Sequence, residues 1–130
     1  MIMRKYLLIS FVFVALLISG CSTGSDNNFI LHVSDQSFDI SPVDIKIYID
    51  GQLMIDEKFA VGNQHNWKKF EYKLSKDKHT LKAVSEKGDA VLEEQFIVVN
   101  NRWAVLGYWS SETTPKKFTF NIQSTPVLFQ

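Results

Sequence analysis

The chain has one cysteine, three prolines and six glycines among its 130 residues. A single cysteine cannot form a disulfide within the chain, so a folded domain must be held together by its hydrophobic core. No segment keeps a helical hydrophobic period for three turns, which argues against a helical bundle or a coiled coil. The 14 basic residues balance the 14 acidic ones, so composition gives no argument for nucleic-acid binding.

Motifs of the common enzyme classes are also missing. The sequence contains no Gly-x-Ser-x-Gly elbow and no phosphate-binding glycine loop. The acid pairs Asp56-Glu57 and Glu93-Glu94 fall in expected strands, so the two carboxylates of each pair point to opposite faces. His32, His65 and His79 are scattered and lack metal-ligand spacing. We therefore expect a protein that is not an enzyme and that needs neither a metal nor a cofactor.

The N-terminus has the layout of a secretory signal peptide. Arg4 and Lys5 form a basic head, and residues 6–18 are apolar except for Ser10. This run is too short for a transmembrane helix, which needs about 20 apolar residues. Small residues then stand directly before the cysteine, in the tetrad Ile18-Ser19-Gly20-Cys21.

That tetrad resembles the lipobox of bacterial lipoproteins. The resemblance implies cleavage between Gly20 and Cys21 and attachment of lipid to the Cys21 thiol, which would anchor the protein to the membrane. Ser22 is not the aspartate that retains lipoproteins of this family in the inner membrane of enteric-type bacteria. The resemblance therefore favours the outer membrane, if the cell has one. The alternative is an ordinary signal peptide with an incidental cysteine.

The residues after the cysteine are small and polar and show no period, as in a flexible tether. We expect a signal peptide at 1–20, the lipidated cysteine and tether at 21–28, and one domain at 29–130. About a hundred residues suffice for a modest core without disulfides.

The expected domain alternates apolar and polar residues, which is typical of half-buried strands. Val43–Ile49 shows this most clearly, and Asp50-Gly51 directly after it predicts a hairpin turn. Turn signals recur about every eight to twelve residues, so we predict an all-β fold, an antiparallel sandwich of seven or eight strands. The expected strands are 29–34, 43–49, 53–59, 67–74, 79–85, 90–99, 102–109 and 118–122.

The segments "YIDGQL", "LSKDKHTLKAVSEKG" and "KKFTFNIQSTPVLF" resemble the hairpins of small bacterial envelope lipoproteins that have no assigned function. The resemblance implies an immunoglobulin-like or transthyretin-like sandwich, and it brings no site residues. A Cys-Trp-Cys framework is missing, which excludes an antibody-type domain.

The strand Arg102–Trp109 is apolar on both faces, whereas a sandwich strand usually buries one face only. We assign Trp103 and Val105 to the core, which leaves Leu106 and Tyr108 on the second face.

A second apolar face must be covered or must dock a partner. We favour cover by the tail Thr125–Phe129, because single domains rarely expose large apolar patches. Gly107 in the same strand permits a bulge or the close approach of another chain.

Lysines gather between residues 66 and 87, at positions 68, 69, 73, 76, 78, 82 and 87. They form either a patch for anionic envelope polymer or lipid headgroups, or two solvated strand faces protected against edge pairing. We favour the solvated faces.

Two classes of function remain. The first is a lipid-anchored binding module for an envelope protein or glycan, with possible contacts at Trp67, Leu106, Tyr108 and Trp109. The second is a structural accessory subunit of a larger envelope assembly. Neither involves nucleic acid.

Overall fold

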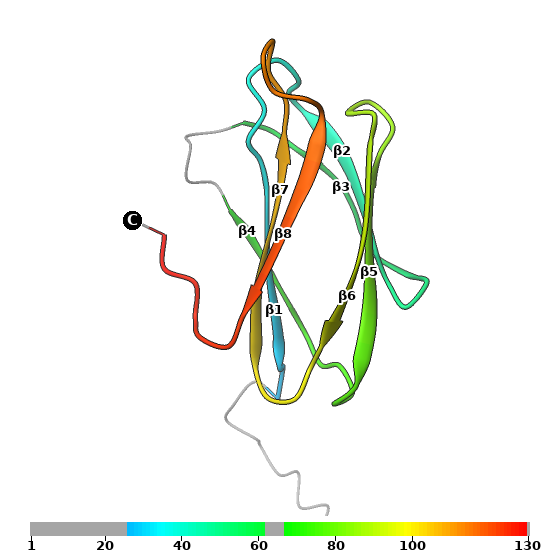
Figure 1. The fold of residues 1–130 in the computed structure, drawn as a ribbon, viewed down its shortest axis with the longest axis vertical. Helices are drawn as coiled ribbons and strands as arrows, with labels where there is room; N and C mark the ends of the chain where they lie inside the picture. The colour runs from blue at the N-terminus through cyan, green and yellow to red at the C-terminus, as the bar shows by residue number, and fades with distance from the viewer. Residues whose placement is uncertain (1–25, 62–66, 130) are drawn as a thin grey trace, which may run out of the picture.

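The computed structural model describes residues 26–61 and 67–129 and is a sandwich of two four-stranded β-sheets (Figure 1). The predicted all-β sandwich is therefore confirmed. The signal peptide, the cleavage site at Gly20 and Cys21, most of the tether, and His65 lie outside the described residues. Within the described ranges, no helix is long and apolar enough to cross a membrane.

The eight strands follow the expected order along the chain. They are β1 (Phe29–Asp35), β2 (Val43–Ile49), β3 (Gln52–Phe59), β4 (Lys68–Tyr72), β5 (Lys78–Ser85), β6 (Ala90–Ile97), β7 (Arg102–Trp109) and β8 (Lys117–Gln123).

The strand order is β4-β1-β7-β8 in one sheet, here called sheet 1, and β3-β2-β5-β6 in the other, sheet 2. The pairing is antiparallel except between β1 and β7, which pair in parallel. In an immunoglobulin sandwich the first strand lies beside the second, whereas β1 lies between β4 and β7. The order therefore differs from that of an immunoglobulin sandwich.

The β2–β3 hairpin forms where the sequence predicts it. Asp50 has a φ of 51° and Gly51 a φ of 79°, so both central turn residues are in the left-handed region. Asp and Gly tolerate that region better than other residues, and the resulting turn matches the twist of the two strands.

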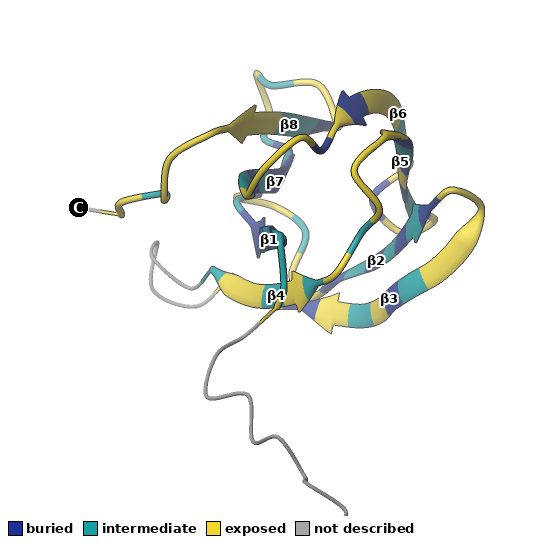
Figure 2. Cartoon of the chain, turned by 90° about the horizontal axis from the view of Figure 1, so that it is seen from below, coloured by how far each residue is buried: buried dark blue, intermediate teal, exposed yellow. Residues whose placement is uncertain are grey.

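Alternation along the strands buries one face of each sheet, and Figure 2 shows buried and exposed positions following one another along the chain. The fully buried side chains come from both sheets, and the largest are Tyr108, Phe29, Leu31, Ile45, Ile47, Leu81 and Leu106. The core therefore lies between the sheets.

The assignment of faces in β7 differs from the sequence prediction. Leu106 and Tyr108 have no exposed surface, whereas Trp103 and Val105 are only partly buried. The prediction that Trp103 and Val105 belong to the core is wrong. In the β1–β7 pairing Leu106 lies opposite the buried Val33, so its side of β7 faces sheet 2.

A polar network closes one end of the core. The Tyr108 hydroxyl donates to the Gly88 carbonyl at 2.7 Å, and the Gly88 N–H donates to Ser85 Oγ at 2.8 Å. Ser85 Oγ donates in turn to Asp44 at 2.9 Å. Burial works against the Asp44 carboxylate, but the hydrogen bonds from residues 85–87 outweigh it and lower the pKa of Asp44.

Candidate functional site

All three tryptophans of the chain lie on the outer face of sheet 1. Trp103 and Trp109 project from β7 on the side opposite Leu106. Trp67 directly precedes β4 and shares a face with Lys69, whose strand partner is His32. None of the tryptophans belongs to the buried core. We call Trp67, Trp103, Trp109, His32 and Val105 the tryptophan face.

Trp109 is held flat against the sheet by its neighbours. Its indole N–H donates to Thr119 Oγ1 on β8 at 2.8 Å. Gly107 lies between them, because it pairs with Thr119 in the β7–β8 ladder. The close approach that Gly107 permits is therefore the approach of the chain's own Trp109 side chain.

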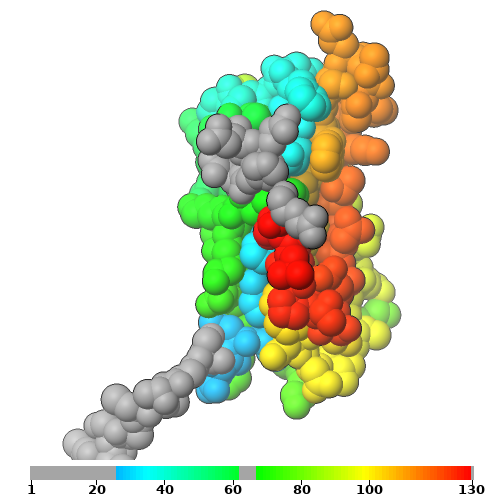
Figure 3. All heavy atoms as spheres, turned by 90° about the vertical axis from the view of Figure 1, so that its left-hand side faces the viewer, coloured from blue at the N-terminus to red at the C-terminus, as the bar shows by residue number. Residues whose placement is uncertain are grey.

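The C-terminal tail, residues 125–129, reaches the tryptophan face. The Phe129 ring stacks on Trp67, with centroids 5.1 Å apart and planes at 16°. Its edge also contacts the His32 ring, with centroids 5.0 Å apart. Figure 3 shows the tail (red) lying on the surface beside β1 (blue). The prediction that the tail covers Leu106 and Tyr108 is wrong: both are buried between the sheets, and the Phe129 ring contacts Trp67 and His32 on the outer face of sheet 1.

The tail is held by few interactions. Leu128 is 84% exposed and Phe129 is 41% exposed. Each aromatic contact contributes roughly 0.5–1.5 kcal/mol, whereas ordering one backbone residue costs about 1–2 kcal/mol. At these magnitudes two ring contacts do not outweigh the ordering of five residues, so the tail is weakly held.

His32 carries a polar atom that the fold does not satisfy. Its Nδ1 is buried and has no hydrogen-bond partner among the described residues. Burial and, to a smaller extent, the positive charge of Lys69 lower the pKa of His32, so the ring is neutral at pH 7. An unsatisfied buried nitrogen is costly and requires an explanation.

The structure separates the predicted contact residues into two groups. Trp67 and Trp109 lie on the outer surface, where a partner can reach them. Leu106 and Tyr108 are fully buried between the sheets, so the prediction that they contact a ligand or partner is wrong. Sequence reasoning missed His32, which alternation from the buried Leu31 would have placed on the outer face.

A second polar cluster has the composition of a catalytic triad but not its geometry. His79 Nδ1 lies 2.6 Å from Asp50 Oδ2, and Ser75 Oγ lies 3.4 Å from His79 Nε2. The Ser75 carbonyl oxygen is closer to Nε2, at 2.8 Å, so Nε2 must carry a proton and donate it. A ring that donates from both nitrogens cannot accept a proton from Ser75.

The charges of this cluster stabilise each other. Burial disfavours the His79 imidazolium, but hydrogen bonds to the Ser75 carbonyl and to Asp50 outweigh it and raise the pKa of His79. The same hydrogen bond lowers the pKa of Asp50. Asp50 lies in the β2–β3 turn and Ser75 follows β4, so the hydrogen bonds of His79 connect the two sheets at one end.

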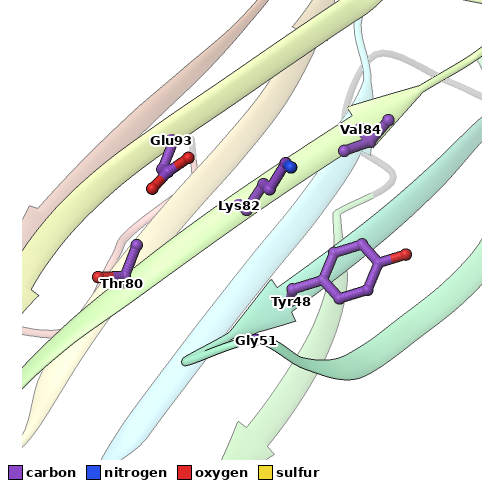
Figure 4. Close-up of a pocket in the computed structure, with 6 residues that line it drawn as sticks. All are labelled: Tyr48, Gly51, Thr80, Lys82, Val84 and Glu93. Atoms are coloured by element: carbon purple, nitrogen blue, oxygen red, sulfur yellow. The ribbon is translucent and has the colours of Figure 1, made fainter.

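A depression on the outer face of sheet 2 is polar and contains a cross-strand ladder. Lys82 lies opposite Tyr48 on one side and Glu93 on the other, and Figure 4 shows these side chains with Thr80 and Val84. Opposite charges on neighbouring strands stabilise a sheet. The ladder therefore needs no ligand to explain it.

The lysine-rich segment does not form one patch. Lys69 lies on the outer side of sheet 1 and Lys82 on the outer side of sheet 2. Several lysines have carboxylate partners: Lys68 with Glu57, Lys69 with Glu71 and Lys73 with Asp26. This arrangement supports the interpretation of solvated strand faces.

No protein-family model and no curated protein matches this chain. The function must therefore be inferred from the tryptophan face itself.

Proposed function

We propose that the chain is a non-catalytic binding module of the bacterial cell envelope, anchored by lipid on Cys21. Its contact surface for an envelope protein or glycan is the tryptophan face. The observation that carries the proposal is that all three tryptophans lie on one outer sheet face and none lies in the core. Tryptophan is enriched at binding hot spots and is costly to leave in water, so such a cluster favours a binding role.

The length of the tether is compatible with that role. The strand β1, which the tether precedes in the sequence, begins at one end of the sandwich (Figure 1). Eight residues, 21–28, span at most about 29 Å when extended. A domain held this way leaves its side face free to contact a partner near the membrane.

The anchor is tested by detergent phase partitioning and mass spectrometry of the mature protein. Wild-type protein should begin at Cys21, carry acyl chains and enter the detergent phase. Cys21→Ser should remain an uncut precursor or become soluble, and the control Ser22→Ala should behave as wild type. An unmodified Cys21 in the wild-type mature protein would refute the anchor.

The binding role is tested by crosslinking in intact envelopes. Trp67→Ala and Trp103→Ala should reduce capture of the bound component. Tyr48→Ala, on the outer face of sheet 2, is the matched control and should leave it unchanged. Equal capture by all variants would contradict the proposal. A complex that survives detergent extraction in every variant would favour the structural accessory subunit.

A further inference from the structure

The tryptophan face already holds a peptide. The Phe129 ring lies against two rings at once, stacked on Trp67 and edge-on to His32. We call the site between Trp67 and His32, where the Phe129 ring lies, the seat. Trp67 adjoins β4 and His32 belongs to β1, so adjacent strands form its two walls. The shape of the seat selects a planar side chain carried on an extended segment.

The occupant is suited to exchange. Within the described part of the tail, the hydrogen bonds run from the Gln123 side chain to the carbonyls of Thr125 and Pro126. They shape the bend after β8 and do not tie residues 127–129 to sheet 1. Leu128 projects into solvent with 84% of its surface exposed. The tail therefore contributes one ring to the seat and little else.

The docked tail does not supply a hydrogen bond to every polar atom of the seat. The Nδ1 atom of His32 remains buried, without a hydrogen-bond partner in the described part of the chain, while Phe129 contacts the ring. A segment that brings a hydrogen-bonding group to this nitrogen would bind more favourably than the tail does. The docked tail is thus a replaceable occupant.

The neighbours of the seat favour a peptide over a glycan. Val105 lies opposite His32, and Trp103 lies opposite Ile30 in the next outward-facing pair of the β1–β7 ladder. Val105 and Ile30 offer no hydrogen bond to the hydroxyl groups of a sugar, which lose hydrogen bonds to water when they are covered, and the Trp103 indole offers only one donor. An apolar or aromatic peptide side chain has no such loss.

We propose that the tryptophan face docks a segment of a partner protein that presents an aromatic side chain. The chain's own tail, residues 125–129, occupies the same seat and is displaced when the partner binds. This inference rests on the proposed function and names the partner class for that surface.

The test uses a synthetic peptide with the sequence of the tail as the ligand of the seat. A chain ending at Ser124 is titrated with the synthetic peptide TPVLFQ, the sequence of residues 125–130, and binding is followed by tryptophan fluorescence and by NMR shifts of the His32 and Trp67 rings. The peptide should bind the truncated chain. The peptide TPVLAQ, which lacks the ring, should bind about ten-fold more weakly. The full-length chain should bind TPVLFQ more weakly than the truncated chain, because its own tail competes for the seat.

Variants assign the binding to the seat. In the truncated chain, Trp67→Ala should abolish peptide binding and Tyr48→Ala should preserve it. If the truncated chain does not fold, the full-length variant Phe129→Ala replaces it, since it empties the seat while keeping the tail.

Several outcomes would overturn the inference. One is the absence of peptide-induced shifts, and another is equal binding of TPVLFQ and TPVLAQ. Binding of chitohexaose in place of the peptide would assign the face to a glycan and leave the proposed binding module intact. A full-length dimer that dissociates on removal of the tail would assign the seat to a second copy of the chain. The crosslinking experiment above separately decides whether the face binds anything.

Discussion

The indole N–H of Trp109 donates to Thr119 Oγ1 at 2.8 Å across the surface of Gly107. A Cβ atom on Gly107 would lie 2.9 Å from Trp109 Nε1 and 3.3 Å from Thr119 Oγ1. The missing side chain therefore allows the indole to lie flat on sheet 1, and the tryptophan face depends on one glycine for its shape.

Gly107→Ala should turn the Trp109 indole away from the sheet and break its hydrogen bond. Losing one such bond costs about 1 kcal/mol of unfolding free energy, and the tryptophan emission should shift to the red as the ring becomes more exposed. Urea unfolding and fluorescence measure both effects. Thr119→Val is the control that removes the acceptor without adding a Cβ at position 107. Unchanged emission in Gly107→Ala would contradict the arrangement.

Gly88→Ala should be more damaging than Gly51→Ala. A Cβ at Gly88 would lie 2.7 Å from the Tyr108 ring and 2.7 Å from Ser85 Oγ, in a buried region. Overpacking of this kind costs about 1–3 kcal/mol, and it would also disturb the bond from Tyr108 to the Gly88 carbonyl.

At Gly51 a Cβ meets open space, and only the positive φ of 79° opposes it, at a cost of about 1–2 kcal/mol. Thermal unfolding of the two variants gives the order. A more stable Gly88→Ala variant would show that Tyr108 can move aside.

Leu106→Ala and Val105→Ala test the two faces of β7. Leu106 is fully buried, so its truncation should cost about 2–5 kcal/mol through lost burial and a residual cavity. Val105 lies on the outer face, where its truncation should cost less than about 1 kcal/mol. Chemical unfolding of both variants gives the comparison, and equal losses would contradict the assignment of faces.

The His79–Asp50 pair should make stability depend on pH in a defined direction. The folded-state pKa of His79 is raised, so its contribution is complete below the unfolded pKa of about 6.5 and is lost as the pH rises through the folded value. The pKa of Asp50 is lowered, so its contribution is present above the unfolded value and is lost as the pH falls through the folded one.

The variant His79→Gln should therefore lose the most stability relative to wild type in mildly acidic solution, and the difference should narrow at alkaline pH. His32 acts in the opposite sense, since its lowered pKa weakens folding as the pH falls. His32 is present in both the wild type and the His79→Gln variant, so its effect cancels in the difference between their unfolding free energies. A stability difference that grows with rising pH would contradict the raised pKa of His79.

Local chemistry made much of the fold predictable. The Asp50-Gly51 turn, the strand Val43–Ile49 and the strand Arg102–Trp109 lie where the sequence predicts them, because turn residues and alternation act within a few residues. The parallel pairing of β1 with β7 could not be predicted in this way, since it joins segments about seventy residues apart and leaves no local pattern.

The residues of the candidate site could likewise be predicted only in part. Aromatic content suggested Trp67 and Trp109 as contacts, and both lie on the surface. Leu106 and Tyr108 were misplaced because size and apolarity alone favoured the tryptophan-bearing face as the core. In the folded chain the Tyr108 hydroxyl finds the Gly88 carbonyl, so the tyrosine can be buried without leaving a polar group unpaired.

Alternation along the chain is enough to give β7 two apolar faces, with Trp103 and Val105 on one and Leu106 and Tyr108 on the other. Which of the two faces is the core depends on contacts between residues far apart in the chain. That choice depends on the partners that sheet 2 and the turn at Gly88 bring to β7, and on the seat that Trp67 and His32 form for Phe129. These contacts join residues distant in the chain, so they contribute to stability only once the sheets have packed.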